Sequence, residues 1–274
     1  MIPRVSLPGT DLAVSRLSFG TARLHHVATR RHRQCLLAAA FEHGFTHFDT
    51  APSYGCGIAE RDLRLFLRGR SGRATVATKV GLYAPDGSHA NIAAVWTRKA
   101  MGKVFPPLSR PVVDWSIMTA RKSLESSLRQ LAVDQIDLLL LHEPIAGAIE
   151  SDAFLEWLQA EQRQGRIRAW GLAGEVDRMH HWLAPSHPLG MVLQVRDSLD
   201  RREADLVMAR GRDLQISYGY LSSRVALPTQ LTVTDTLTRA MRRNATGSVL
   251  VSTHRLDHLG ELAALAEQDD DNNR

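Results

Sequence analysis

Cysteine is nearly absent from this chain: Cys35 and Cys56 are the only two among 274 residues. Two cysteines make no disulfide framework and suit a reducing compartment. No apolar run approaches the ~20 residues that a membrane-spanning helix needs. The segment Met1–Val5 leads directly into polar, proline-containing sequence, which predicts no secretory signal. Since no Pro/Ser-rich linker divides the chain, we expect one domain over 1–274. The cysteine content and the lack of a signal or spanning segment lead us to expect a cytoplasmic protein that does not contact a membrane.

Aromatic residues are also few, at 6%, whereas hydrophobic residues make up 44% and charged residues 23%, which is ordinary for a globular protein. The formal net charge of +5 is by itself compatible with nucleic acid as a ligand. The clustered arginines, however, alternate with leucine and alanine where helices should expose a polar face. We interpret them as solvated helix surface and expect no nucleic-acid binding. They are Arg30, Arg31, Arg33, Arg64, Arg68, Arg70 and Arg73.

Short apolar runs alternate with helical patterns along the chain, which is typical of repeated strand–helix units and a parallel sheet. Eight such units close a barrel, typically in about 250 residues. The sequence therefore predicts an α/β fold, a (β/α)8 TIM barrel, with a small β-hairpin of Val5–Leu7 and Leu12–Val14 ahead of it. The expected barrel strands are Leu17–Gly20, Thr46–Asp49, Thr75–Lys79, Asp137–Leu141, Ala169–Leu172, Val192–Gln194, Gln215–Tyr218 and Ser248–Val251.

Helices are expected between these strands, and two other segments look irregular. The connection 82–115 is long for a compact barrel, and a loop of this length usually has a function. The final segment, 268–274, is so polar that we expect a disordered tail there. The expected helices include 31–43, 116–131, 145–164 and 256–266.

Four polar residues stand at the ends of three apolar runs: Asp49 and Tyr54, then Lys79, then His142. Because the carboxyl ends of parallel barrel strands converge on one face, we expect these side chains to meet. A phenol can protonate a carbonyl oxygen if its pKa falls toward neutrality, and a nearby ammonium favours the phenolate. An aspartate would keep that ammonium charged, and an imidazole would position the substrate oxygen. Taken singly, each of the four is more often an ordinary rim or packing residue.

Three motifs resemble the aldo-keto reductase superfamily, and the resemblance runs from about residue 5 to 266. It implies hydride transfer between a nicotinamide cofactor and a carbonyl, with Tyr54 as general acid and Lys79, Asp49 and His142 in support. The long 82–115 connection is more similar to the sugar-dehydrogenase branch than to the aldose reductase branch. The motifs are Val14–Thr21; Phe48–Ala51 with Tyr54, Gly55 and Glu60; and Arg121–Leu128 followed by Ile136–His142.

The resemblance also implies where the nicotinamide half of the cofactor would bind. Gln194 matches the contact to the carboxamide, and Tyr218 matches the ring that stacks on nicotinamide. The family usually has Ser-Asn after the fifth strand, whereas this chain has Ala173-Gly174, so two side-chain hydrogen bonds are missing unless Glu175 or water replaces them. The remaining expected contacts are Gly20 and Thr21 beside the nicotinamide, and Leu221, Ser222 and Ser223 at the pyrophosphate.

The adenosine 2′-phosphate would lie at the last strand and helix, where the chain departs from the family again. Leu262 aligns with the family's asparagine, and His258 with its arginine. Thr253 with the helix amino-terminus can still bind phosphate, and Arg255 or Arg224 can supply charge from a shifted position. We expect NADP(H), with NAD(H) as the alternative cofactor. The aligned positions are Ser252, Thr253, Arg255, His258 and Glu261.

Other features of the sequence have less specific explanations. His254, His258 and Glu261 fall at helical spacing, but we interpret them as incidental and expect no metal. Cys56, two residues after Tyr54, is expected to be a small filler. The aromatic residues of the long connection either line a substrate pocket or anchor the connection to the barrel rim. They are Trp96, Phe105 and Trp115.

The sequence thus predicts an oxidoreductase that transfers hydride between NADP(H) and a small carbonyl or alcohol substrate. The alternative is a barrel kept as a binding or regulatory module, with redox activity absent or vestigial. The departures at Ala173-Gly174 and Leu262 motivate that alternative. The complete set of Tyr54, Lys79, Asp49 and His142 argues against it.

Overall fold

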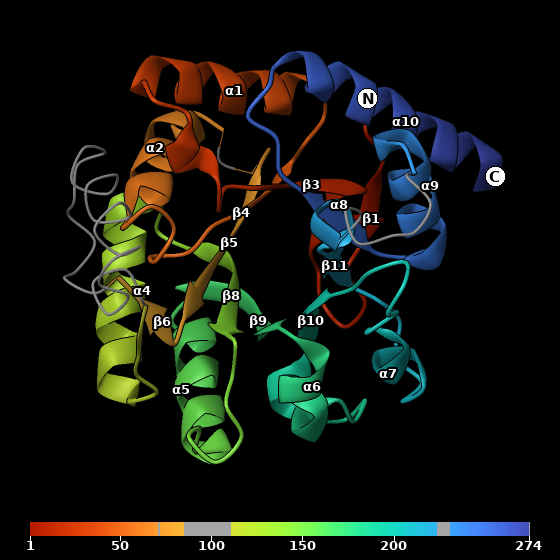
Figure 1. The fold of residues 1–274 in the computed structure, drawn as a ribbon. Helices are drawn as coiled ribbons and strands as arrows, with labels where there is room; N and C mark the ends of the chain where they lie inside the picture. Colours follow the sequence, from red (N-terminus) through yellow and green to blue (C-terminus); the bar gives the residue numbers. More distant parts are fainter. Residues whose placement is uncertain (71, 85–110, 224–230, 274) are drawn as a thin grey trace, which may run out of the picture.

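The computed structural model of the chain describes residues 1–70, 72–84, 111–223 and 231–273. The barrel strands are β3 (Leu17–Gly20), β4 (His47–Asp49), β5 (Thr75–Val80), β8 (Ile136–His142), β9 (Ile167–Gly174), β10 (Val192–Arg196), β11 (Ile216–Tyr218) and β12 (Ser248–Val251). They pair in parallel and close in the order β10-β11-β12-β3-β4-β5-β8-β9 (Figure 1). The predicted α/β barrel is confirmed, and each predicted strand overlaps the observed one.

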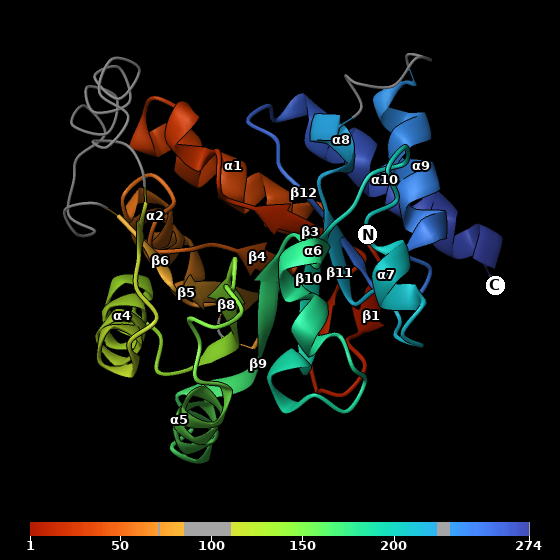
Figure 2. The ribbon, with the colours of Figure 1, turned by 60° about the horizontal axis from the view of Figure 1, so that its bottom comes forward.

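Helices surround the barrel (Figures 1 and 2). Three of the longer ones begin at a hydroxyl residue whose side chain accepts a hydrogen bond from a backbone N–H of the first turn: Thr29, Ser116 and Thr232. Such caps satisfy donors that have no partner within the helix. The α-helices are α1 (Arg30–Glu42), α2 (Ile58–Leu67), α4 (Ile117–Leu131), α5 (Ser151–Arg163), α6 (Val176–Met179), α7 (Asp205–Met208), α8 (Tyr220–Ser223), α9 (Val233–Arg243) and α10 (Asp257–Asn273). The 3-10 helices are η1 (Leu24–His26), η3 (His180–Trp182) and η4 (Pro188–Gly190).

The predicted start of α5 at residue 145 is wrong, because the helix begins at Ser151. Gly147 has a φ of 85°, a left-handed conformation that interrupts a right-handed helix. The segment between Pro144 and Ser151 therefore forms turns, although its apolar residues fit a helical spacing.

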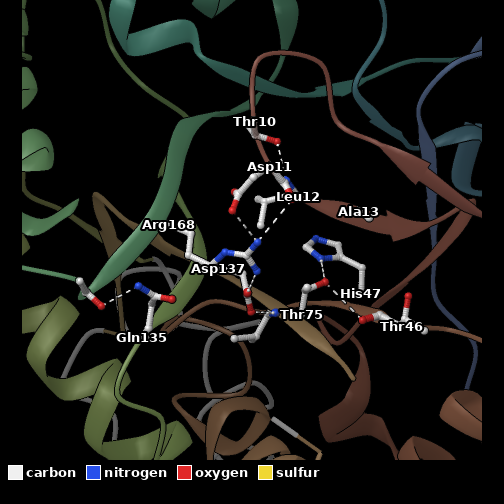
Figure 3. Close-up of polar contacts among 12 residues, drawn as sticks. Thr10, Asp11, Leu12, Ala13, Thr46, His47, Thr75, Gln135, Asp137 and Arg168 are labelled. Carbon is white, nitrogen blue, oxygen red and sulfur yellow. Dashed lines mark hydrogen bonds and ion pairs between the residues drawn. The ribbon is translucent and has the colours of Figure 1, made fainter. Parts of the chain in front are cut away.

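A hairpin closes the amino-terminal end of the barrel. Strands β1 (Arg4–Ser6) and β2 (Ala13–Ser15) pair antiparallel, as predicted. Figure 3 shows Arg168 between the hairpin and the barrel: its guanidinium donates to Asp11 at 3.0 Å and to Asp137 of β8 at 2.7 Å. Hairpin side chains pack with inward-facing side chains of the strands in one buried cluster, so side chains fill this end of the barrel. The cluster includes Leu7, Leu12, Val14, Ala77, Leu138, Leu140, Ala169, Ala173, Val192 and Ile216.

The carboxyl-terminal segment corrects another prediction. A disordered tail was expected from 268, but α10 continues as far as Asn273. The buried Asp269 carboxylate accepts hydrogen bonds from Arg16 at 3.0 and 3.2 Å, and Arg16 also donates to the carbonyl of Met241 at 2.7 Å. The polar composition suggested solvated coil, whereas a buried guanidinium partner next to β3 fixes this part of the helix.

The two ends of the long connection are held together. Strands β6 (Leu82–Tyr83) and β7 (Val112–Val113) pair antiparallel, and the connection between them, with Trp96 and Phe105, lies outside the described residues. Trp115 packs closely over Gly81, where a Cβ would lie 2.1 Å from the indole ring. Trp115 therefore anchors the connection to the barrel rim. Among the described residues, no helix combines the length and apolarity that a membrane crossing requires.

Candidate active site

The register of the barrel brings three of the four predicted polar residues to one end. Asp49 ends β4, while Lys79 and His142 lie at the carboxyl ends of β5 and β8. Lys79 pairs in register with Leu140 of the buried interior cluster, so its side chain points into the barrel. The Lys79 ammonium donates to Asp49 Oδ1 at 2.5 Å and to the Thr50 carbonyl at 2.8 Å. The predicted ion pair is present and fully buried, with side-chain exposures of 1% and 2%.

Tyr54 reaches the same point from the loop between β4 and α2. Gly55, Cys56 and Gly57 have φ values of 57°, 51° and 80°, three successive left-handed residues that turn the chain sharply. At Gly55 a Cβ would lie 2.8 Å from the Cβ of His25, so a larger residue does not fit. For Cys56, a non-glycine residue, this conformation is uncommon, and such residues cluster at functional sites.

The rings of Tyr54 and His142 approach edge to face, with centroids 5.9 Å apart and an interplanar angle of 83°. The Lys79 ammonium lies 4.8 Å from the centre of the Tyr54 ring. The structure therefore brings all four predicted residues together. A carbonyl oxygen placed between Tyr54 and His142 would meet both polar groups.

The electrostatics of Tyr54 differ from the expectation that Lys79 would bring its pKa toward neutrality. Burial raises the pKa of Tyr54 well above its usual value, and the charges of Asp49 and Glu143 raise it further. Burial also lowers the pKa of Lys79, an effect that its ion pair with Asp49 opposes. Because the aspartate largely compensates the ammonium, Tyr54 is held as a neutral phenol, the form that can donate a proton.

His142 is held neutral as well. Burial and the charge of Lys79 lower its pKa from 6.5 to about 3. A neutral imidazole carries one N–H donor and one acceptor, and the Nδ1 atom is buried without a hydrogen-bond partner. His142 can therefore orient a substrate oxygen by hydrogen bonding without carrying a charge.

A cavity of about 660 Å³ opens above these residues, within the range of about 300–1,000 Å³ that is usual for ligand sites. Nine of the residues predicted for catalysis or cofactor binding line it. They are Gly20, Asp49, Tyr54, Lys79, His142, Gln194, Tyr218, Leu221 and Ser252. Ser222, also expected at the pyrophosphate, is part of the same wall.

The wall of the cavity fits a nicotinamide group at two points, Gln194 and Tyr218. The Gln194 amide oxygen is buried and has no partner, so it can accept a hydrogen bond from a carboxamide. Tyr218 presents an aromatic ring at the end of β11. At Gly20 a Cβ would lie 2.7 Å from Ser252 Oγ, so the missing side chain lets Ser252 approach β3 and donate to the Gly20 carbonyl at 2.9 Å. The chemistry of these residues matches an amide-bearing planar ring.

Six other predicted cofactor residues are absent from the cavity wall formed by the described part of the chain. Thr21 is buried and donates to the Asp49 carbonyl at 2.8 Å, which ties β3 to β4. Ser223 donates to the Gly219 carbonyl at 3.0 Å. Thr253 Oγ1 accepts from the backbone N–H of Arg255 at 3.1 Å. The other three are Arg255, His258 and Glu261.

The segment between β12 and α10 bears the expected 2′-phosphate residues. Arg255 is exposed and paired with Asp257, its Nε lying 3.1 Å from Oδ1, so its charge is partly compensated there. His258 Nδ1 lies 3.4 Å from Thr253 Oγ1. Thr253, Arg255 and His258 are thus neighbours, whereas Arg224 lies outside the described residues. Across 1–70, 72–84, 111–223 and 231–273, His, Cys, Asp and Glu form no group of three that could hold a metal ion.

Several residues of the wall were not predicted as site residues, and the most informative is Glu143. It follows His142 directly and has a φ of 52°, which turns it back toward β9. Its position beside His142 was visible in the sequence, but its left-handed backbone was not. The other residues missed include Ala22, Arg23, Arg196 and Tyr220.

Comparison with known proteins agrees with this geometry. The model of the aldo/keto reductase family matches residues 16–193. The chain is 30% identical over 182 residues to pyridoxal 4-dehydrogenase from Microbacterium luteolum, covering 60% of this chain and 49% of that enzyme. It is 29% identical over 209 residues to D-threo-aldose 1-dehydrogenase from Pseudomonas sp., covering 73% and 58%. The chain thus spans about half the length of these two dehydrogenases.

Solved structures match over nearly the whole chain. A Pseudomonas aeruginosa protein assigned to the aldo-keto reductases superposes with a TM-score of 0.74 at 25% identity, covering 97% of this chain and 95% of that one. An aldo-keto reductase from Klebsiella pneumoniae, solved in complex with NADPH, shares the fold with a TM-score of 0.67 at 19% identity, covering 97% and 91%. The family match extends over more than half of the chain and includes Asp49, Tyr54, Lys79 and His142. This chain belongs to the aldo/keto reductase family.

Proposed function

We propose that this protein transfers hydride reversibly between NADP(H) and an aldehyde or ketone, giving the corresponding alcohol. The observation that carries the proposal is the assembly of Tyr54, Lys79, Asp49 and His142 at the floor of one cavity. A hydrogen-bond acceptor without a partner, Gln194 Oε1, lies in the wall of the same cavity. A binding module would need neither the buried ion pair nor the proton donor beside it.

The residues divide the chemistry of reduction among them. Tyr54 donates its hydroxyl proton to the carbonyl oxygen as negative charge develops there, and His142 hydrogen-bonds the same oxygen and orients it. Lys79, 4.8 Å from the ring centre, stabilises the phenolate that Tyr54 becomes. Asp49 keeps Lys79 charged and in place. A bound reduced nicotinamide supplies the hydride that adds to the carbonyl carbon, and in the reverse direction the Tyr54 phenolate takes the proton from the alcohol.

The finer assignments rest on the resemblance and on the relatives. NADP(H) is proposed over NAD(H) because Thr253 and Arg255 lie together in the segment between β12 and α10, where the 2′-phosphate is expected. Pyridoxal and aldoses, named for the two dehydrogenases above, suggest small polar aldehydes and their hydroxyl counterparts as the first substrates to assay.

The proposal is tested by titrating the protein with NADPH and with NADH and by assaying carbonyl reduction, each with the wild type and Tyr54→Phe. The variant should keep the dissociation constant for NADPH within about twofold, and its turnover should fall by about 10²–10⁴-fold, the usual contribution of a positioned acid. Unchanged turnover would remove Tyr54 from the mechanism. A wild-type protein that binds neither cofactor would favour the binding-module alternative.

A further inference from the structure

The top of β9 supplies no side-chain hydrogen bond to the cavity. Ala173 lies level with His142 of β8 on one side and with Gln194 of β10 on the other. Each of these two neighbours has a polar atom that is buried without a partner, His142 Nδ1 and Gln194 Oε1. The next residue, Gly174, has no side chain. A ligand group over this point of the wall must therefore be recognised by residues of the neighbouring strands.

The carboxylate of Glu143 occupies the space that a side chain at residue 174 would use. A Cβ built on Gly174 would lie 2.8 Å from Glu143 Oε2. The backbone N–H of Glu143 donates to the Ala173 carbonyl at 2.7 Å, and Oε2 accepts from the backbone N–H of Glu175 at 3.3 Å. Only 22% of the side chain is exposed, and Glu143 lines the cavity.

We propose that Glu143 binds the carboxamide –NH2 group of the nicotinamide ring, beside Gln194, whose contact to this group the family resemblance already implies. This inference rests on the function proposed above. The two N–H bonds of the amide would each meet one acceptor, the Glu143 carboxylate and the Gln194 amide oxygen, on either side of Ala173. The ring would then lie next to Tyr54 and His142, where a substrate carbonyl is held.

Glu175, which the sequence offered beside water as a replacement, is less suited to this contact. Its side chain is 48% exposed, and its carboxylate is paired with Arg196 at 3.1 Å. The nearest charged partner of Glu143 is Arg178, 3.9 Å away and itself 57% exposed. Burial raises the pKa of Glu143 above its usual value, so a donor from a ligand would offset part of its desolvation.

The test compares dissociation constants for NADP⁺ and for its 3-acetylpyridine analogue, in which a methyl group replaces the –NH2. The wild type should prefer NADP⁺. In Glu143→Ala the ratio of the two constants should fall by about tenfold, the effect of one hydrogen bond to a charged group. Glu143→Asp keeps the charge, and aspartate tolerates a left-handed backbone. Its side chain is shorter, so the carboxylate lies farther from the ligand and the ratio should fall here as well. Glu175→Ala is the matched control and should leave it unchanged.

A third ligand separates this inference from the proposed function. 2′-Phospho-ADP-ribose lacks the nicotinamide ring, so the wild type and all variants should bind it equally, which also verifies that the site is folded. Suppose that Glu143→Asp or Glu143→Ala binds this fragment normally and still prefers NADP⁺ over the analogue as strongly as the wild type does. This result would overturn the role of Glu143 and leave the proposed function intact. If the wild type binds neither NADP⁺ nor the fragment, the proposed function itself fails.

Discussion

At the scale of single residues, the buried pair of Lys79 and Asp49 is the feature on which the site depends. Neither charge has appreciable contact with water, and the carbonyl of Thr50 is the further acceptor for the ammonium. Removing one partner of such a pair leaves a buried charge uncompensated, whereas removing both does not. The pair therefore contributes both to stability and to the charge beside Tyr54, the proton donor proposed above.

This coupling predicts the effects of charge removal. Asp49→Asn should lower the free energy of unfolding by about 3 kcal/mol, because the Lys79 ammonium stays buried without its counter-ion. The double variant Asp49→Asn/Lys79→Met should recover most of that loss, yet both should lack carbonyl reduction. Urea denaturation at pH 7 measures the stabilities. If the double variant is no more stable than Asp49→Asn, the pair is not the source of the loss.

At the scale of elements, α10 shows how one contact fixes a segment whose composition suggests disorder. Arg16, buried beside β3, donates to the carbonyls of Met241 and Asn244 as well as to Asp269. It thereby links the end of α9, the turn before β12 and the last helix. The acidic run from Asp269 onward predicted a solvated chain because composition alone does not identify a guanidinium some 250 residues away in sequence.

The contribution of this link can be measured. Asp269→Asn should lower the free energy of unfolding by about 3 kcal/mol, since the Arg16 guanidinium would be left buried without a charged partner. Asp134→Asn, at an exposed position between α4 and β8, is the matched control and should change stability by less than about 0.5 kcal/mol. Equal stability of the two variants in urea denaturation would show that α10 is not anchored through Asp269.

At the scale of the whole molecule, the fold was predictable because each barrel strand is a short apolar run that alternates in the sequence with turns and helical patterns. The meeting of Asp49, Lys79 and His142 followed from strand-end positions alone. Backbone conformation was not predictable in the same way: the left-handed Glu143, the turn at Gly147 and the place of Glu143 over Gly174 depend on tertiary contacts. The raised pKa of Tyr54 was also missed, because burial outweighs the nearby ammonium.

The stability of the whole barrel should depend on pH through His47, which lies at its closed end. Its side chain is fully buried against Thr75 (Figure 3), and burial with the charge of Lys79 lowers its pKa from 6.5 to about 3. Below pH 6.5 the unfolded chain gains a proton here that the folded chain does not bind until about pH 3. Stability is therefore complete above pH 6.5 and is lost as the pH falls through this window.

Between pH 7 and pH 5 this single residue should lower the free energy of unfolding by about 2 kcal/mol, the linkage expected for a displacement of 1.5 pH units below its unfolded pKa. His142, whose pKa is also lowered to about 3, acts in the same direction. Urea denaturation across this range should therefore show a shallower pH dependence in His47→Gln than in the wild type. His32→Gln, at an exposed position of α1, should leave the slope unchanged. If His47→Gln keeps the full wild-type slope, His47 is not the buried titrating group, and the acid sensitivity of the barrel originates elsewhere.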